Sequence, residues 1–366
     1  MISSSTVQQL PLSPRLLSER ESSVEIMLCG PQERDLWDAY VHHAPRATMC
    51  HQFAWRPIIQ QAYGHRTFYL MARSEDQVRG VLPLVLVKRP LFGRSLTSMP
   101  FLDYGGICAD DEAVAKRLMD YAVRLRQEHH IDSVELRQCE PPAQTGTVRL
   151  DKVSMILDLS SGAKAVWRSL PAKVRNQVRK AKKSGLTASA GGCELLDEFY
   201  DVFAVNMRDL GSPVHDRAFF STMLAEFGSH AKLVVARDGR RAVGGLVCLF
   251  FKDTVLVPWA SSLREYFPKC PNNLLYWEAI QFGCARGCTR FDFGRSSIGS
   301  GTYDFKEQWG AKPRQLYWHV LSKNGRQSTT LSAANPKYRL ALEVWRRLPL
   351  TLTKVLGPRI RKYLTN

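Results

Sequence analysis

The sequence is poor in several features that mark particular classes of protein. Its longest obvious apolar run, Val243 to Phe251, falls well short of the about 20 residues that cross a bilayer. The first residues lack both the basic start and the apolar core of about 7–15 residues that a secretory signal needs. Residues 1–23 are instead expected to form a disordered N-terminal tail. We therefore expect a cytoplasmic protein without a membrane-spanning segment.

Cysteine and histidine patterns predict neither a disulfide framework nor a metal site. The nine cysteines are odd in number and contain no C-x-x-C pair, which favours reduced thiols. Cys284 and Cys288 lie one helical turn apart without histidine partners, so we expect them in the core. No H-E-x-x-H motif is present, and no metal is expected.

Motifs for nucleotide hydrolysis and for hydrolysis by a serine nucleophile are also absent. Gly294 and Gly299 have the spacing of a phosphate loop, but Ser300 and Gly301 stand where such a loop needs Lys and Ser or Thr. No G-x-S-x-G elbow occurs. Both kinds of hydrolysis are therefore unexpected.

Positive charge is abundant and concentrated in two segments. The net charge is +17 and the pI about 9.6, which predicts attraction to nucleic acid, phosphorylated substrates or an anionic membrane. Residues 164–184 hold eight Lys or Arg and no acid. Trp167, Leu170, Val174, Val178 and Ala181 recur there every three or four residues, which predicts a helix with one apolar and one basic face. That basic face could bind phosphates or simply be solvated.

The second basic segment lies in the C-terminal tail, residues 321–366. Residues 337–362 hold eight Lys or Arg against Glu343. Six large apolar residues alternate with these cations, as in a helix that lies at a membrane interface: Trp345, Leu348, Leu352, Leu356, Ile360 and Leu364. Packing on the rest of the protein needs the same pattern, so both alternatives stand.

The chain contains an internal repeat at an offset of 164 residues. Seven residues of the first copy meet identical residues of the second without a gap: Ala54, Gly64, Ala72, Arg73, Gly80, Leu82 and Lys88 match Ala218, Gly228, Ala236, Arg237, Gly244, Leu246 and Lys252. The period is too long for a solenoid. It predicts two copies of one domain, residues 24–150 and residues 151–320, with the basic helix 164–184 leading into the second.

Each copy predicts the same α/β plan. A helix (33–42; 195–207) and a second helix ending at Tyr63 or Phe227 precede two β-rich runs, a longer helix and a final strand. The β-rich runs are joined by short turns and are expected to pair as hairpins, which makes each sheet mixed. The fold class is therefore α/β (α+β), with helices flanking a mixed sheet in each half.

Candidate site residues lie around the final strand of the second copy. The segment YFPKCPNNLLYWEAI places Lys269, Asn272 and Asn273 at a helix start, where free N–H groups and the helix dipole bind phosphate. A capped helix start needs no ligand, so the pattern alone is weak. The strand end carries Asp292, Arg295 and Ser296; Asp292 is a candidate proton acceptor, although a carboxylate there is more often a hydrogen-bond anchor.

The segment FKEQWG follows this strand. Phe305 and Trp309 are four residues apart and share one helical face, with Lys306 beside them. A lysine next to two aromatic residues could clamp a phosphate or an oxyanion, or could belong to an ordinary amphipathic turn. The sequence leaves both interpretations open.

Taken together, these motifs resemble the FemAB/FemX family of tandem-GNAT-fold transferases, and most closely its variants associated with exosortase and exopolysaccharide gene clusters. The resemblance covers about residues 30–320 and depends on KVRNQVRKAKKSGL, PNNLLYWEAIQFGCARGCTRFDFGRSS, FKEQWGAKP and, in the first half, FLDYGGI with Asp103 and Tyr104. It implies transfer of an acyl or aminoacyl group to an amine. It further implies that Phe305 and Lys306 act in the transfer, and that basic residues near Arg175 and Arg179 face substrate phosphates. We assign Lys180 to the same phosphate-binding group.

The sequence departs from this resemblance in two places. The segment REYFPKCPNN stands where an acetyl-CoA-binding GNAT enzyme has its glycine-containing pyrophosphate loop, and no long coiled-coil arm is present. The donor is therefore undecided between acyl-CoA and aminoacyl-tRNA.

We expect an N-acyltransferase that acts on an amine of a cell-envelope precursor, of peptidoglycan or exopolysaccharide. It would bind no cofactor beyond its donor and no DNA, with peripheral contact to an anionic membrane as an option. The alternative is a non-catalytic GNAT-like module that binds an anionic glycan carrier or RNA.

Overall fold

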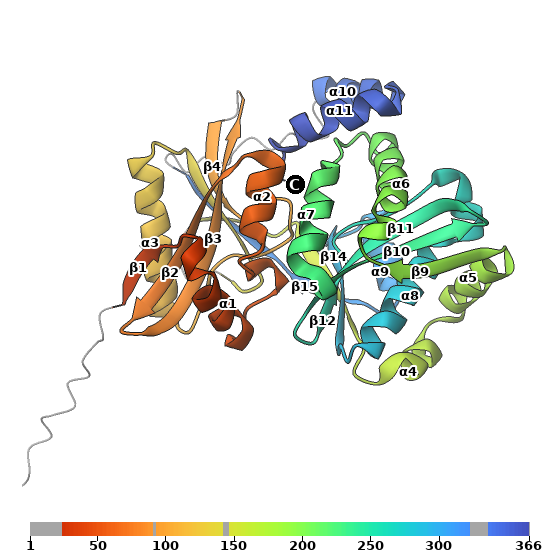
Figure 1. Cartoon of the computed structure of the whole chain (residues 1–366), viewed down its shortest axis with the longest axis horizontal. Coiled ribbons are helices and arrows are strands. Elements are labelled where there is room, and N and C mark those ends of the chain that lie inside the picture. Colours follow the sequence, from red (N-terminus) through yellow and green to blue (C-terminus); the bar gives the residue numbers. More distant parts are fainter. Residues whose placement is uncertain (1–23, 91–92, 142–145, 323–335, 366) are drawn as a thin grey trace, which may run out of the picture.

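The computed structural model describes residues 24–90, 93–141, 146–322 and 336–365, with side chains from residue 340 in the last range. The expected N-terminal tail, residues 1–23, lies outside these ranges. Two β-sheets stand side by side, each flanked by helices, and two C-terminal helices lie against the second half (Figure 1). This is the mixed α/β architecture that the sequence predicts.

The first sheet has the strand order β1-β2-β3-β4-β6-β16-β7, with β5 paired to β3. Its strands are β1 (Glu25–Leu28), β2 (Arg66–Ser74), β3 (Gln77–Arg89), β4 (Gly93–Ser98), β5 (Cys108–Ala109), β6 (Ser133–Gln138), β7 (Thr147–Arg149) and β16 (Tyr317–Ser322). Three helices accompany it: α1 (Arg34–His43), α2 (Trp55–Tyr63) and α3 (Glu112–Glu128).

The second sheet has the order β15-β8-β14-β12-β11-β10-β9, with β13 paired to β11. Its strands are β8 (Lys152–Asp158), β9 (Leu186–Gly191), β10 (Ala231–Asp238), β11 (Arg241–Phe251), β12 (Thr254–Leu256), β13 (Ala260–Ser262), β14 (Arg290–Ser297) and β15 (Lys312–Gln315). Its helices are α4 (Gly162–Ser169), α5 (Ala172–Lys183), α6 (Leu196–Asp209), α7 (Arg217–Phe227), α8 (Pro271–Ala285) and α9 (Gly301–Glu307).

The two sheets repeat each other in detail. The hairpin β2–β3 has a register shift at Ala72/Arg73, and β10–β11 has one at the equivalent Ala236/Arg237. Both copies also place a parallel strand pair after the hairpin, β4 with β6 and β12 with β14. The predicted internal repeat is therefore a structural one.

The repeated glycine of β3 and β11 has a packing reason. A Cβ on Gly80 would lie 3.0 Å from Leu118 of α3, and one on Gly244 would lie 2.9 Å from Leu275 of α8. Glycine lets the long helix of each half approach its sheet closely.

The basic segment 164–184 forms two helices rather than one. The break falls at Leu170 and Pro171, because a proline disfavours helical backbone in the residue before it. The expected apolar face is present, with Val174, Val178 and Ala181 buried in the core of the second half.

One strand crosses between the halves. Residues 317–320 were expected with the second domain, but β16 pairs antiparallel with β6 and extends the first sheet. Its residue Trp318 is buried in a core cluster that contains residues of both halves. Helices α2 and α7 join this cluster, with the rings of Trp55 and Phe227 5.0 Å apart. The two halves thus share one core.

The C-terminal helices α10 (Pro336–Arg347) and α11 (Leu350–Arg361) dock on the protein. Both contact α6, and Gly357 lies so close to Val214 that a Cβ would come within 2.8 Å of its side chain. At the end of the chain, the carbonyl of Thr365 accepts a hydrogen bond from the backbone N–H of Phe101 at 3.3 Å. Within the described ranges, no helix is long and apolar enough to cross a membrane.

Candidate functional site

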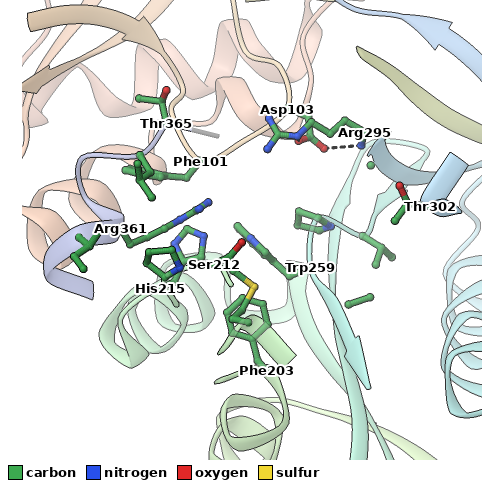
Figure 2. A pocket seen from close by; sticks show the side chains of 18 of the residues that line it. Phe101, Asp103, Phe203, Ser212, His215, Trp259, Arg295, Thr302, Arg361 and Thr365 are labelled. Atoms are coloured by element: carbon green, nitrogen blue, oxygen red, sulfur yellow. Dashed lines mark hydrogen bonds and ion pairs between the residues drawn. The ribbon is translucent and has the colours of Figure 1, made fainter. Parts of the chain in front are cut away.

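A cavity of about 760 Å³ opens between the two sheets and beneath α11. We call it the interdomain cavity. It is within the size range of ligand-binding pockets. Figure 2 shows side chains from the first half, the second half and the C-terminal helix converging on it. Its wall contains five basic residues and two acidic ones: Arg89, Arg149, Arg295, Lys306 and Arg361, and Asp103 and Glu135.

Lys306 is a buried member of this wall. It lies on the short helix α9, which begins after Ser300, whose hydroxyl accepts a hydrogen bond from the N–H of Tyr303. The ammonium group donates to the carbonyls of Gly294 at 2.9 Å and Arg295 at 2.8 Å. Burial lowers the pKa of Lys306 to about 8, although Asp103 and Asp292 act in the opposite direction. The third N–H of the ammonium group is not used in these bonds.

A backbone irregularity in β14 presents the two carbonyls to Lys306. The pairing with β8 shifts register between Asp292 and Arg295, and Gly294 between them has φ +72°. A side chain at Gly294 would meet Asp103 and the carbonyl of Val257, both 3.1 Å from an added Cβ. The backbone therefore needs glycine here, both for its conformation and for space.

Asp103 ties this strand to the first half. Its carboxylate accepts the backbone N–H of Arg295 at 2.9 Å and pairs with the Arg295 guanidinium at 3.2 Å. The same guanidinium lies 5.3 Å from the ring of Trp318. Arg295 is thereby held at the cavity wall, and one of its terminal nitrogens, Nη1, is buried without a hydrogen-bond partner among the described residues.

Asp292 is buried and fully engaged. It accepts hydrogen bonds from the hydroxyls of Tyr104 at 2.6 Å and Ser154 at 2.5 Å, and from the N–H of Gly294 at 2.8 Å. Burial raises the pKa of Asp292, while these bonds oppose the rise. Asp292 and Tyr104 line a second cavity of about 470 Å³ rather than the interdomain cavity. The arrangement is that of a hydrogen-bond anchor between the halves.

The comparisons with known proteins concern the fold and the family of the second half. Residues 168–307 match a family described as an acetyltransferase (GNAT) domain. The second half of the chain contains a GNAT domain. No curated protein matches the sequence.

Solved structures extend the likeness to both halves. The chain is similar to FemX, with TM-score 0.65 and 15% identity over 82% of this chain and 98% of that one. It is also similar to L-PGS from Bacillus licheniformis (TM-score 0.53, 14% identity, 90% and 96% covered). A third likeness is to a C-terminal domain from Agrobacterium fabrum, described as part of a lysylphosphatidylglycerol synthetase (TM-score 0.55, 12% identity, 80% and 93% covered). The predicted α/β fold of two similar halves, each a mixed sheet with flanking helices, is confirmed, and the GNAT match lies in its second half.

Within the GNAT domain, the aromatic partners of Lys306 serve packing. Phe305 lies 5.4 Å from the ring of Tyr276 and 6.4 Å from that of Trp309. Phe305 and Trp309 belong to or pack against the core of the second half and do not line the interdomain cavity. Tyr276, on α8, and Phe293, on β14, are the aromatic residues that reach from this cluster to the cavity wall. Ser296 is also buried away from that wall, and its hydroxyl has no partner in the described part of the chain.

The basic residues of α5 are not brought to the interdomain cavity. Arg175 donates to the carbonyls of Arg168 at 2.9 Å and Leu170 at 2.5 Å, and so caps the end of α4. Arg179 stacks over Trp167 at 5.6 Å, and Lys180 is exposed. Helix α5 lies on the outer side of the second half (Figure 1). Part of the basic face therefore caps the end of a neighbouring helix, a role that the charge pattern alone does not reveal.

The start of α8 is likewise outside the cavity. Lys269 pairs with Asp238 at 2.5 Å, Asn272 accepts a hydrogen bond from Ser262 at 2.7 Å, and Asn273 donates to Gln177 at 3.2 Å. These three side chains therefore already have protein partners. In the described part of the chain, no group of three His, Cys, Asp or Glu residues is placed to hold a metal.

Most wall residues are missing from the sequence-based candidates, among them Arg361 and His215. Arg361 comes from α11, and His215 lies just before α7. A signal for Arg361 exists in retrospect, because Thr353, Gly357 and Arg361 recur every four residues and all three are buried. His215 belongs to no motif, and only the tertiary structure places it at the cavity.

Proposed function

We propose that this protein transfers an acyl or aminoacyl group to an amine of a cell-envelope precursor, and that the reaction takes place in the interdomain cavity. The observation that carries the proposal is Lys306, a buried cation in the cavity wall of a GNAT domain. A cation held in a water-poor wall stabilises developing negative charge far better than one in bulk water.

The reaction needs few chemical participants. The neutral amine nitrogen attacks the donor carbonyl carbon, and the carbonyl oxygen takes up negative charge in the tetrahedral intermediate. The carbon–sulfur or carbon–oxygen bond of the donor then breaks. The amine loses its proton, and the departing thiolate or alkoxide takes up a proton. Lys306 would stabilise the oxyanion or a donor phosphate, and the walls of both halves would align the two substrates.

The donor is proposed to be acyl-CoA or aminoacyl-tRNA. The GNAT match supports an acyl-CoA donor. The name of the lysylphosphatidylglycerol synthetase describes the making of an aminoacyl lipid, which supports an aminoacyl donor and an envelope acceptor. The excess of basic over acidic residues in the cavity wall suits either polyanionic donor.

We also propose that the protein contacts an anionic membrane through α10 and α11. Of the twelve exposed large apolar side chains in the described chain, these two helices carry six: Leu340, Val344, Leu352, Val355, Leu356 and Ile360. Exposed cations accompany them, among them Arg347 and Arg359. Ile360 also lines the interdomain cavity, so a membrane bound at this face would lie next to its mouth.

The decisive experiment supplies the purified chain with labelled acyl-CoA or charged tRNA and with amine-bearing envelope precursors. We expect transfer from one donor class. Lys306→Ala should lower turnover at least about tenfold at a temperature where the variant is fully folded, although the carbonyls of Gly294 and Arg295, left without their donor, should lower its melting temperature by a few degrees. Lys183→Ala, which removes an exposed lysine of α5, is the matched control and should keep full activity.

Two results would contradict the proposal. Equal loss of folding and activity in Lys306→Ala would make Lys306 a packing residue. Retained binding of an anionic glycan carrier or RNA without transfer from either donor would identify a non-catalytic binding module, whose affinity should fall steeply with salt.

A further inference from the structure

Arg361 is a buried cation without an acidic partner. It ends α11 and is 8% exposed. Among the described residues, no carboxylate pairs with it and none of its nitrogens has a hydrogen-bond acceptor; its Nε is fully buried without a partner. Its guanidinium lies 5.8 Å from the ring of Phe101. Burial lowers the pKa of Arg361 to about 10. Burial of an unpaired arginine is unfavourable in free energy, and a bound anion would offset this cost.

The other cations of the interdomain cavity already have partners. Arg295 pairs with Asp103 at 3.2 Å, and Arg149 pairs with Asp151 at 3.4 Å. Lys306 donates to two carbonyls. Arg89 donates to the hydroxyl of Thr365 at 3.2 Å and is attracted to Glu135. Arg361 therefore differs from them in lacking any such contact within the described ranges.

His215 supplies a second unused donor next to Arg361. Its Nδ1 is hydrogen-bonded to the hydroxyl of Tyr63, which has no other acceptor among the described residues and so donates its proton to this nitrogen. The ring proton of neutral His215 then lies on Nε2, which is buried without a partner. Burial, together with the charge of Arg361, holds the pKa of His215 well below its usual range. His215 is therefore a neutral N–H donor.

Aromatic rings surround these two donors. The His215 ring lies 5.7 Å from Trp259, 5.8 Å from Phe101 and 6.3 Å from Phe203. Figure 2 shows the Arg361 guanidinium beside His215 and pointing into the cavity, with Phe203 and Trp259 on the same side. One positive charge, one neutral donor and apolar walls together suit a singly charged oxyanion on an apolar body.

We propose that Arg361 and His215 form a carboxylate-binding subsite, and that a substrate of this protein carries a carboxylate group that binds there. The guanidinium fork matches a carboxylate in a bidentate arrangement. A phosphate monoester would bring about 1.5–2 negative charges, more than the single positive charge of the subsite balances. This proposal adds a carboxylate group to the substrate of the proposed acyl transfer. Only the statement that the bound ligand is a substrate rests on that proposed function.

The test measures thermal stabilisation of the full chain by phenylacetate and by its uncharged analogue phenylacetamide. Phenylacetate should raise the melting temperature of the wild type, and phenylacetamide should not. Arg361→Gln should abolish the shift. Arg359→Gln removes an exposed arginine of the same helix and should leave the shift intact.

The unliganded variants separate binding from folding. Arg361→Gln should melt at or above the wild-type temperature, because it removes an unpaired buried charge. Three outcomes would overturn the subsite. Phenylacetate would leave the melting temperature of the wild type unchanged, phenylacetamide would raise it as much as phenylacetate does, or phenylacetate would still raise it in Arg361→Gln. A larger Arg361-dependent shift by inorganic phosphate would overturn its assignment to carboxylates. Carboxylate binding without any acyl transfer would leave the subsite standing and contradict only the proposed function.

Discussion

Lys306 combines burial with a nearly complete set of hydrogen bonds, and this determines which protonation state can act. Two backbone carbonyls accept its N–H groups, and carbonyls favour the ammonium form. Burial favours the neutral amine and prevails, so the pKa falls from its ordinary 10.5 to about 8. Near neutral pH the group is still mostly cationic, as stabilisation of an oxyanion or phosphate requires.

The pH dependence of turnover tests this role. If the cationic form acts, kcat/KM should fall as pH rises through about 8, to about a tenth of its neutral-pH value near pH 9. The sign follows because Lys306 loses its charge above its folded-state pKa. Lys306→Met should show low activity without this fall. A rise through pH 8 that is lost in Lys306→Met would make Lys306 a proton acceptor and contradict the assignment, whereas a rise shared by both proteins reports deprotonation of the acceptor amine.

At the scale of elements, the sequence predicts which helices and strands recur in the two halves better than it predicts where each element packs. The offset of 164 residues predicts the paired hairpins, and even the register shifts at Ala72 and Ala236 recur at that offset. Periodicity likewise predicts the buried face of α5. The buried face is a local feature that depends on spacing along one element, and the repeat is found by aligning the chain with itself.

The placement of β16 and α11 could not be predicted in the same way. A strand pattern does not say which sheet edge the strand will join, so the crossing of residues 317–322 to the first sheet appears only in the structure. An amphipathic helix has the same pattern whether its apolar face meets protein or lipid. The sequence therefore does not predict Arg361 and His215 as site residues. It does predict Lys306, which lies next to aromatic residues on a short helix.

The two faces of the C-terminal helices lead to a vesicle-binding prediction. Trp345 and Gly357 face the protein, whereas Val344 and Val355 are 53% and 55% exposed. Val344→Asp together with Val355→Asp should weaken sedimentation with vesicles rich in anionic lipid by about tenfold or more, without changing the melting temperature. Leu36→Asp changes a residue of α1 that is 46% exposed and should sediment as the wild type does.

Point variants test the proposed lipid-facing side of α10 and α11 more specifically than removal of residues 336–366 does. Truncation would also delete Arg361 and the contact between Thr365 and Phe101, which changes the cavity itself. Unchanged sedimentation of the double aspartate variant would contradict a lipid role for this face.

The whole molecule is held as one unit by contacts that cross between its halves. One core cluster contains residues of both sheets, β16 completes the first sheet from the far end of the chain, and Tyr104 of the first half donates to Asp292 of the second at 2.6 Å. Because the interdomain cavity is built between these contacts, its shape depends on the halves keeping their relative position.

Calorimetry of Tyr104→Phe tests this unity. The variant leaves the buried carboxylate of Asp292 without one of its three donors, which costs about 1–3 kcal/mol and should lower the melting temperature by roughly 1–4 °C in a chain of this size. Because the halves share a core, the loss should shift a single transition. Tyr121→Phe removes a hydroxyl that has no hydrogen bond to a described residue and should leave the transition in place. Two separate transitions, with only one moved by Tyr104→Phe, would show instead that the halves unfold independently and that the cavity between them is free to open.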